Sequence, residues 1–178
     1  DLSANTGGSS DVVMAMTSLM YDQSLFRVYN VLTGQKTVWY YDVDRNFDGK
    51  YDAQDKDVHY DLNFCIVTSP ISFSCGNLFP SLCKDAGLLI AGQKSGGGSC
   101  AVGAHRTADG FYYQISAAQA RLSDANRQNI NGGITPHVEI AYDAQGVIPY
   151  DGRDYTVYSY SNFWDLDYLS AIIGEYYK

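Results

Sequence analysis

The spacing of apolar residues along the chain predicts which segments are helical and which are extended. Between residues 10 and 21, apolar residues recur every three to four positions, which is the period of a helix with one buried face. A serine or aspartate within residues 9–11 can cap the start of this helix. Residues 24–33 and 35–43 are rich in β-branched and aromatic residues and flank a short turn, which predicts two paired strands.

The rest of the chain alternates between extended and helical patterns. The predicted elements are a strand over 60–68, a helix over 76–87, a strand over 87–92, a glycine-rich loop over 93–103, a strand over 109–116, an extended segment within 131–143 and a helix over 163–177. This alternation is typical of an α/β domain with a partly parallel sheet. Tyrosines concentrate after residue 150, and we expect them to pack with their hydroxyls reaching solvent rather than to form a peptide-binding surface.

Composition limits the classes of function. With 178 residues, of which 46% are apolar, the chain has the length and composition of one globular domain with a hydrophobic core. The net charge of −8 is uneven, because seven aspartates fall within residues 42–61, and a nucleic-acid partner is therefore not expected. The sequence contains no apolar run of about 18 residues, so no membrane span is expected in it.

The four cysteines, Cys65, Cys75, Cys83 and Cys100, include no CxxC pair. This spacing argues against a zinc site and against a thioredoxin-like site. An even number of cysteines permits disulfides without requiring them, so the disulfide state stays open. We expect Cys65 and Cys83 to act as small buried apolar residues.

The stretch Ser-Pro-Ile-Ser-Phe-Ser-Cys-Gly-Asn, residues 69–77, lies between a predicted strand and a predicted helix. A hydroxyl at such a junction lies close to the first free N–H groups of the helix, which favours a nucleophile there. Ser72 and Ser74 are the two candidates. We interpret Ser72 as a turn or capping hydroxyl and Ser74 as the nucleophile.

Four motifs occur in order along the chain: DLSANTGG (1–8), TSPISFSCGN (68–77), LLIAGQKSGGGS (88–99) and GGITPHVEI (132–140). Together they resemble the motifs of the S41 serine peptidases, which include the C-terminal processing and tricorn-like peptidases. The resemblance implies a ClpP/crotonase-like α/β core with a partly parallel sheet and flanking helices. It also implies that residues 1–178 form a single domain that is the C-terminal portion of a peptidase domain, with an upstream portion of the same protein missing.

The resemblance assigns roles to individual residues. Ser74 falls at the position of the family's nucleophile, and the N–H of Cys75 with the turn at Gly7 and Gly8 falls at the position of its oxyanion hole. The implied activity is that of a serine endopeptidase acting on a peptide or protein substrate. The resemblance also implies an extracytoplasmic location, in which the protein is secreted or lies in a bacterial cell envelope.

The general base is the catalytic residue with the weakest support in this sequence. Gly98 stands where one branch of the family has its lysine, and Lys94 precedes that position by four residues. The tricorn-like branch takes a histidine from sequence that precedes this segment, so we expect the base to come from upstream. Asn77 stands where many members carry a glutamate. His59, His105 and His137 are the local substitutes, each without a supporting motif.

These departures leave two alternatives to a peptidase. One is a peptide-binding module that keeps the peptidase fold without turnover, which Gly98 and Asn77 favour. The other is a calcium-stabilised structural domain without an active site.

The acidic segment DRNFDGKYDAQD, residues 44–55, follows the pattern of a calcium-binding loop. In that pattern the ligands are Asp44, Asn46, Asp48, the carbonyl of Lys50, Asp52 and Asp55. Gly49 occupies the sharp-turn position. Because residues before the loop predict a strand, we expect a structural Ca²⁺ loop inserted between strands, with a solvated acidic hairpin as the alternative.

Overall fold

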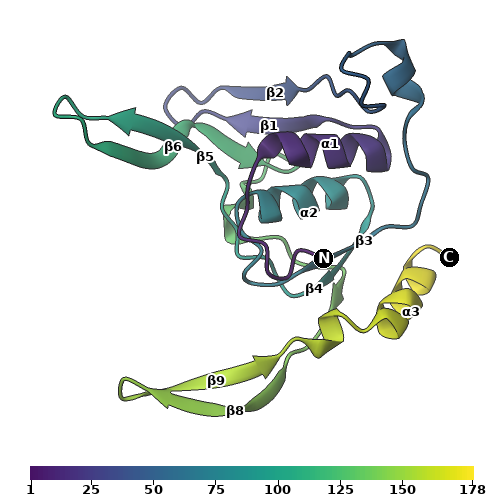
Figure 1. The fold of residues 1–178 in the computed structure, drawn as a ribbon, viewed down its shortest axis with the longest axis vertical. Coiled ribbons are helices and arrows are strands. Elements are labelled where there is room, and N and C mark those ends of the chain that lie inside the picture. The colour runs from purple at the N-terminus through teal and green to yellow at the C-terminus, as the bar shows by residue number, and fades with distance from the viewer.

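The computed structural model describes residues 1–99 and 101–178, so any disulfide involving Cys100 lies outside the described residues. Figure 1 shows the order of the elements along the chain. They are α1 (Ser10–Tyr21), β1 (Leu25–Tyr29), β2 (Lys36–Tyr40), η1 (Ala53–Asp57), β3 (Cys65–Thr68), α2 (Cys75–Asp85), β4 (Leu89–Gly92), β5 (Cys100–Arg106), β6 (Tyr112–Ser123), η2 (Ile130–Gly132), β7 (Val138–Glu139), β8 (Asp143–Tyr150), β9 (Arg153–Ser159), η3 (Ser161–Phe163) and α3 (Leu166–Tyr176).

Two sheets enclose a pair of helices (Figure 1). The first sheet is antiparallel, in the order β2-β1-β6-β5, and the second is parallel, in the order β3-β4-β7. Helices α1 and α2 lie side by side between them, and their apolar faces form the main core with both sheets. The predicted α/β class with a partly parallel sheet is confirmed.

Local sequence signals place several elements as predicted. Helix α1 begins after Ser9, whose Oγ accepts the N–H of Asp11 at 3.1 Å, and it ends at Asp22, which has a left-handed φ of 58°. Strands β1 and β2 pair across the turn, as their β-branched and aromatic residues predict. Cys83 is fully buried in the core and Cys65 is half-buried on β3, in line with their predicted apolar roles.

The bounds of two extended segments differ from the predicted ones, and one hairpin was not predicted. Strand β5 begins within the predicted glycine-rich loop, and its partner β6 continues to Ser123, seven residues beyond the predicted end. The tyrosine-rich segment contains a β8–β9 hairpin, whose turn at Asp151 and Gly152 has positive φ angles of 49° and 70°. The extended segment predicted within 131–143 is present as the two-residue strand β7, and the last residue of this range begins β8.

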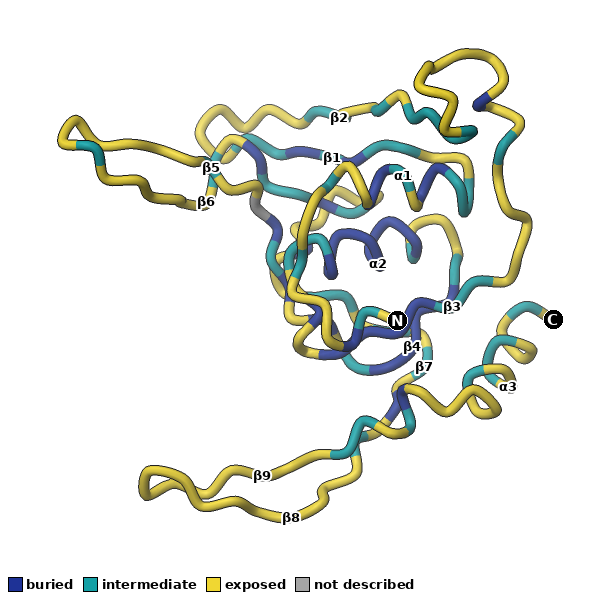
Figure 2. Tube along the Cα trace, viewed as in Figure 1, coloured by how far each residue is buried: buried dark blue, intermediate teal, exposed yellow. Residues whose placement is uncertain are grey.

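The C-terminal tyrosines follow two patterns. Figure 2 shows that the β8–β9 hairpin is exposed over most of its length. Tyr155 and Tyr158 are about half exposed, and their rings pack against Tyr150 and Tyr142 at centroid distances of 6.3 Å and 5.4 Å, in line with the predicted packing. Tyr177 packs through its hydroxyl, which donates to the carbonyl of Phe64 at 2.7 Å and accepts the N–H of Leu89 at 3.0 Å. The chain end is thereby joined to the parallel sheet.

Candidate active site

Ser74 occupies a strained turn between β3 and α2. Its φ of 57° and ψ of −118° are unusual for a residue with a side chain. Such a conformation costs roughly 1–3 kcal/mol and persists only where surrounding contacts impose it. Here the N–H of Ser74 donates to the carbonyl of Gly97 at 2.9 Å, and the N–H of Phe73 donates to the carbonyl of Asn5 at 3.0 Å. The turn is therefore held between the N-terminal segment and the glycine-rich loop.

Glycines allow these segments to approach Ser74. A Cβ added to Gly7 would lie 2.7 Å from the Cβ of Ser74, and one added to Gly98 would lie 3.0 Å from its N atom. Both glycines also have positive φ angles, 117° and 85°. Position 98 consequently has no room for a lysine side chain in this conformation.

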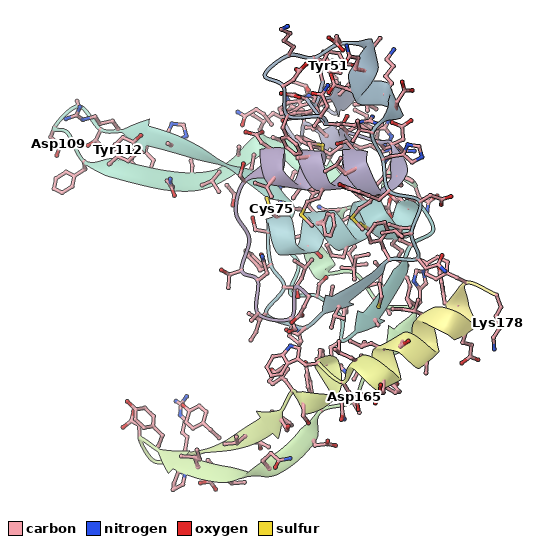
Figure 3. The ribbon with its side chains drawn as sticks, turned by 45° about the vertical axis from the view of Figure 1, so that its right-hand side comes forward. Tyr51, Cys75, Asp109, Tyr112, Asp165 and Lys178 are labelled. Atoms are coloured by element: carbon pink, nitrogen blue, oxygen red, sulfur yellow. The ribbon has the colours of Figure 1, made fainter. Side chains whose placement is uncertain are left out.

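Two of the three predicted oxyanion-hole residues have available N–H groups. Among the described residues, no acceptor contacts the N–H of Cys75, the first residue of α2, or the N–H of Gly8. Gly7 differs, because its N–H donates to Oδ1 of Asn5 at 2.8 Å. The Cys75 thiol donates to the carbonyl of Gly8 at 3.1 Å, so the two residues are in direct contact. Figure 3 shows Cys75 at the start of α2.

Ser72 has the structural role that we predicted for it. It is fully buried, its Oγ donates to the carbonyl of Leu2 at 2.7 Å, and it accepts the N–H of Ser69 at 2.9 Å. These two bonds close the turn before Ser74 and attach it to the N-terminal segment. The interpretation of Ser72 as a turn hydroxyl is therefore confirmed.

Asn77 is a buried structural amide. Its Nδ2 donates to the carbonyls of Ile130 at 2.9 Å and Gly98 at 3.2 Å, and its Oδ1 accepts the hydroxyl of Ser95 at 2.6 Å. The side chain is fully buried. These bonds join α2 to the glycine-rich loop and to η2, a role that sequence reasoning missed because all three partners are distant in sequence.

No described lysine or histidine hydrogen-bonds to Oγ of Ser74. Lys94 is exposed, as expected, and His59 is exposed as well. The imidazole of His105 stacks on Tyr113 at a centroid distance of 5.4 Å. In His137, Nδ1 already accepts the N–H of Ile90 at 3.1 Å, and burial, with a smaller effect of Lys84, lowers the pKa of its imidazole. A base from upstream sequence stays a prediction.

A pocket of about 240 Å³ opens beside Ser74. Its walls are apolar and come from four strands and a helix: Phe26 on β1, Trp39 on β2, Ala101 and Val102 on β5, Ala120 and Leu122 on β6, and Leu78 on α2. Phe26 and Trp39 are directly opposed across β1 and β2, with ring centroids 5.5 Å apart. No Asp, Glu, Lys, Arg or His lines the pocket. We call this cavity the apolar pocket.

The acidic loop lies between β2 and β3, as predicted, and its carboxylates bind its own backbone. The two oxygens of Asp44 accept the N–H groups of Asp48 at 3.1 Å and Gly49 at 2.7 Å. The buried Asp55 accepts the N–H groups of Asp52 and Arg45, each at 2.7 Å. These bonds lower the pKa of its carboxyl group, and the bond from Asp52 has the largest effect.

The donor chemistry of this loop suits a hard cation, since its side chains present only oxygen atoms. The described residues nevertheless contain no group of three or more His, Cys, Asp or Glu side chains arranged to hold a metal. Calcium binding therefore stays a prediction. None of the described helices has both the length and the apolarity needed to cross a membrane.

Comparison with known proteins places these features in a family. The sequence model of peptidase family S41 matches residues 1–140, which include Ser74, the apolar pocket and the glycine-rich loop. The β8–β9 hairpin and α3 lie beyond this match. No curated protein matches the chain significantly.

Two solved structures share the fold. A photosystem II D1 C-terminal processing protease is 18% identical with a TM-score of 0.61, over 79% of this chain and 33% of that chain. A lipoprotein from Streptococcus agalactiae is 16% identical with a TM-score of 0.55, over 79% of this chain and 49% of that chain. The chain thus spans about a third of the first protein and half of the second.

Proposed function

This chain belongs to peptidase family S41, and on that premise we propose that it carries the nucleophile of a serine endopeptidase. The observation that carries the proposal is the geometry of Ser74. Its strained turn places the half-buried Ser74 in the wall of the apolar pocket, together with Cys75 and Gly8, whose N–H groups are available. Backbone strain maintained at a single residue is a frequent property of catalytic positions.

The proposed reaction is acyl transfer to Ser74 followed by hydrolysis. The Oγ atom attacks the substrate carbonyl and its proton passes to a general base, while the N–H groups of Cys75 and Gly8 stabilise the oxyanion. The C–N bond then breaks, the amine leaves with the proton, and water hydrolyses the acyl-enzyme. Because no described lysine or histidine bonds to Oγ, we propose that sequence outside residues 1–178 supplies the base.

The apolar pocket supports a substrate with a large apolar residue on the N-terminal side of the cleaved bond. A cavity of roughly 150 Å³ lined by aliphatic and aromatic residues can hold a benzene ring, and this pocket measures about 240 Å³. A charged side chain would lose its hydration there without gaining a partner. We therefore propose phenylalanine or leucine at this substrate position.

We also propose an extracytoplasmic location for the protein. This is consistent with a lipoprotein among the structural neighbours.

The nucleophile is tested with a fluorophosphonate probe and intact-mass detection on the full native protein. We expect one adduct on the native protein, none on Ser74→Ala, and an unchanged adduct on Ser170→Ala, which removes an exposed hydroxyl on α3. An adduct that persists in Ser74→Ala would refute the assignment.

Substrate preference is tested with peptides that differ only at the residue before the cleaved bond. We expect phenylalanine and leucine to be cleaved about tenfold faster than lysine. Trp39→Glu should reverse part of this preference by placing a carboxylate in the pocket wall. Tyr40→Glu is the matched control, because Tyr40 is the neighbouring residue, is 75% exposed and does not line the pocket.

The second candidate function is a peptide-binding module without turnover. The specific observation in its favour is the buried amide of Asn77, which is held by three hydrogen bonds at a position where many family members carry a glutamate. This candidate predicts no adduct, and a peptide affinity that Ser74→Ala leaves unchanged.

A further inference from the structure

A second pocket, of about 260 Å³, lies among β1, β2, β6 and the turn after β6. Three cationic side chains line it, Lys36, Arg121 and Arg127, together with Tyr29. We call it the basic pocket. Leu122 lines both this pocket and the apolar pocket, but none of the three cationic residues lines the apolar pocket.

Strand register creates the floor of the basic pocket. Tyr29 on β1 is directly opposite Lys36 on β2 and directly opposite Arg121 on β6. Directly opposed residues of neighbouring strands share one face of the sheet, so these three side chains form a row. Arg127 is added from the turn after β6, where its guanidinium donates to the carbonyl of Thr37 on β2 at 3.3 Å.

The positive charge of this pocket is not neutralised by the described residues. No Asp or Glu lines the pocket, and neither described ion pair, Arg27–Asp85 or Arg45–Asp22, includes one of its three cations. The nearest acidic residue in sequence, Asp124, uses Oδ1 to accept the N–H of Gln128 at 2.8 Å. Three like charges gathered in a protein with a net charge of −8 repel one another unless an anion joins them.

One guanidinium atom of the pocket lacks a partner. Nε of Arg121 is buried from solvent and has no hydrogen-bond acceptor among the described residues. A buried donor of a charged group without an acceptor is unfavourable, and in native proteins an ion or a water often satisfies such a group. The planar guanidinium is suited to two parallel bonds with one oxyanion.

We propose that the basic pocket binds an oxyanion, either a carboxylate or a phosphate group, held by Arg121 with support from Lys36 and Arg127. The row imposed by strand pairing gives the anion a fixed position, and the pocket volume leaves space for the group that carries it. This inference does not depend on the proposed peptidase function, because none of the three cations lines the apolar pocket beside Ser74.

Isothermal titration calorimetry on the full native protein, in a buffer free of phosphate and carboxylate, tests the proposal. One arm uses inorganic phosphate. The other compares a short peptide that ends in a free α-carboxylate with the same peptide ending in an amide. Saturable binding of phosphate alone identifies a phosphate group as the ligand, whereas binding of the acid peptide but not the amide identifies a carboxylate. Absence of binding in both arms overturns the proposal.

Variants distinguish the pocket from the general surface charge. The double variant Lys36→Gln/Arg127→Gln changes two exposed residues and should weaken binding about tenfold or more, because two charge-assisted bonds are lost. The matched control, Lys94→Gln/Arg153→Gln, removes the same charge from exposed positions elsewhere and should leave affinity unchanged. Equal weakening in both double variants would overturn the proposal, since it would indicate non-specific attraction.

Discussion

Replacement of Asn77 by alanine should destabilise the protein severely, because the amide is fully buried and joins three partners. The change removes hydrogen bonds to Ile130, Gly98 and Ser95. Each lost bond with a buried partner left behind costs about 1 kcal/mol or more, so we expect a loss of roughly 3–4 kcal/mol. That is a large fraction of the ~5–15 kcal/mol by which a typical domain is stable.

Urea unfolding followed by circular dichroism measures this loss. With an m-value of about 2–3 kcal/mol/M for a domain of this size, the midpoint should fall by roughly 1–2 M. Asn77→Asp should be at least as damaging, because it places a carboxylate against two carbonyl oxygens. Asn162→Ala is the control, since Asn162 makes one exposed bond, to Asp143. A loss below about 1 kcal/mol for Asn77→Ala would refute the role of this amide as the link between α2 and the glycine-rich loop.

Three further predictions concern the Ser74 turn and the acidic loop. Gly98→Ala should lower stability and abolish the fluorophosphonate adduct, because its Cβ would crowd the Ser74 turn. The control is Gly34→Ala, which is also at positive φ but has no atom near its Cβ, and it should leave the adduct intact. An adduct on Gly98→Ala would contradict the crowding of Ser74 by a side chain at position 98. If the loop binds calcium, a chelator should lower the melting temperature of the native protein but not of Asp48→Ala, and identical melting with and without chelator would exclude the metal. The lowered pKa of the Asp55 carboxyl group contributes stability that is complete above its ordinary pKa of 3.8 and is lost as the pH falls through the lower pKa of the folded state. Asp55→Asn should therefore reduce the fall of the melting temperature at acid pH. Parallel curves of melting temperature against pH for the two proteins would contradict this.

Much of the fold could be predicted because its signals are local. The period of three to four in residues 10–21 corresponds to α1 residue for residue. The β-branched pattern around Gly34 corresponds to β1 and β2, and the Ser74 turn lies between a strand and a helix as its flanking residues indicate. Hydrogen bonds within a helix or across a short turn join residues close in sequence, so their pattern is visible there.

The β5 strand and the β8–β9 hairpin were not predicted, because local sequence signals do not indicate either of them. Glycines before β5 predict a loop, and only pairing with β6 makes the segment extended. The β8–β9 hairpin is exposed at almost every position, including apolar residues such as Val147 and Ile148, so no alternation of buried and exposed residues indicates it. Tertiary or cross-strand pairing overrides weak local preference in both segments.

The sequence by itself determined the order of the motifs, the helix and strand periods and the identity of Ser74 as a candidate nucleophile. Only the tertiary structure decided that Gly8 rather than Gly7 has an available N–H, that Gly98 excludes a lysine, and that Asn77 is structural. It alone assembled the apolar and basic pockets from separate strands. The physical reason is that each of these properties depends on atoms brought within contact distance by folding, and separation along the chain does not record such distances.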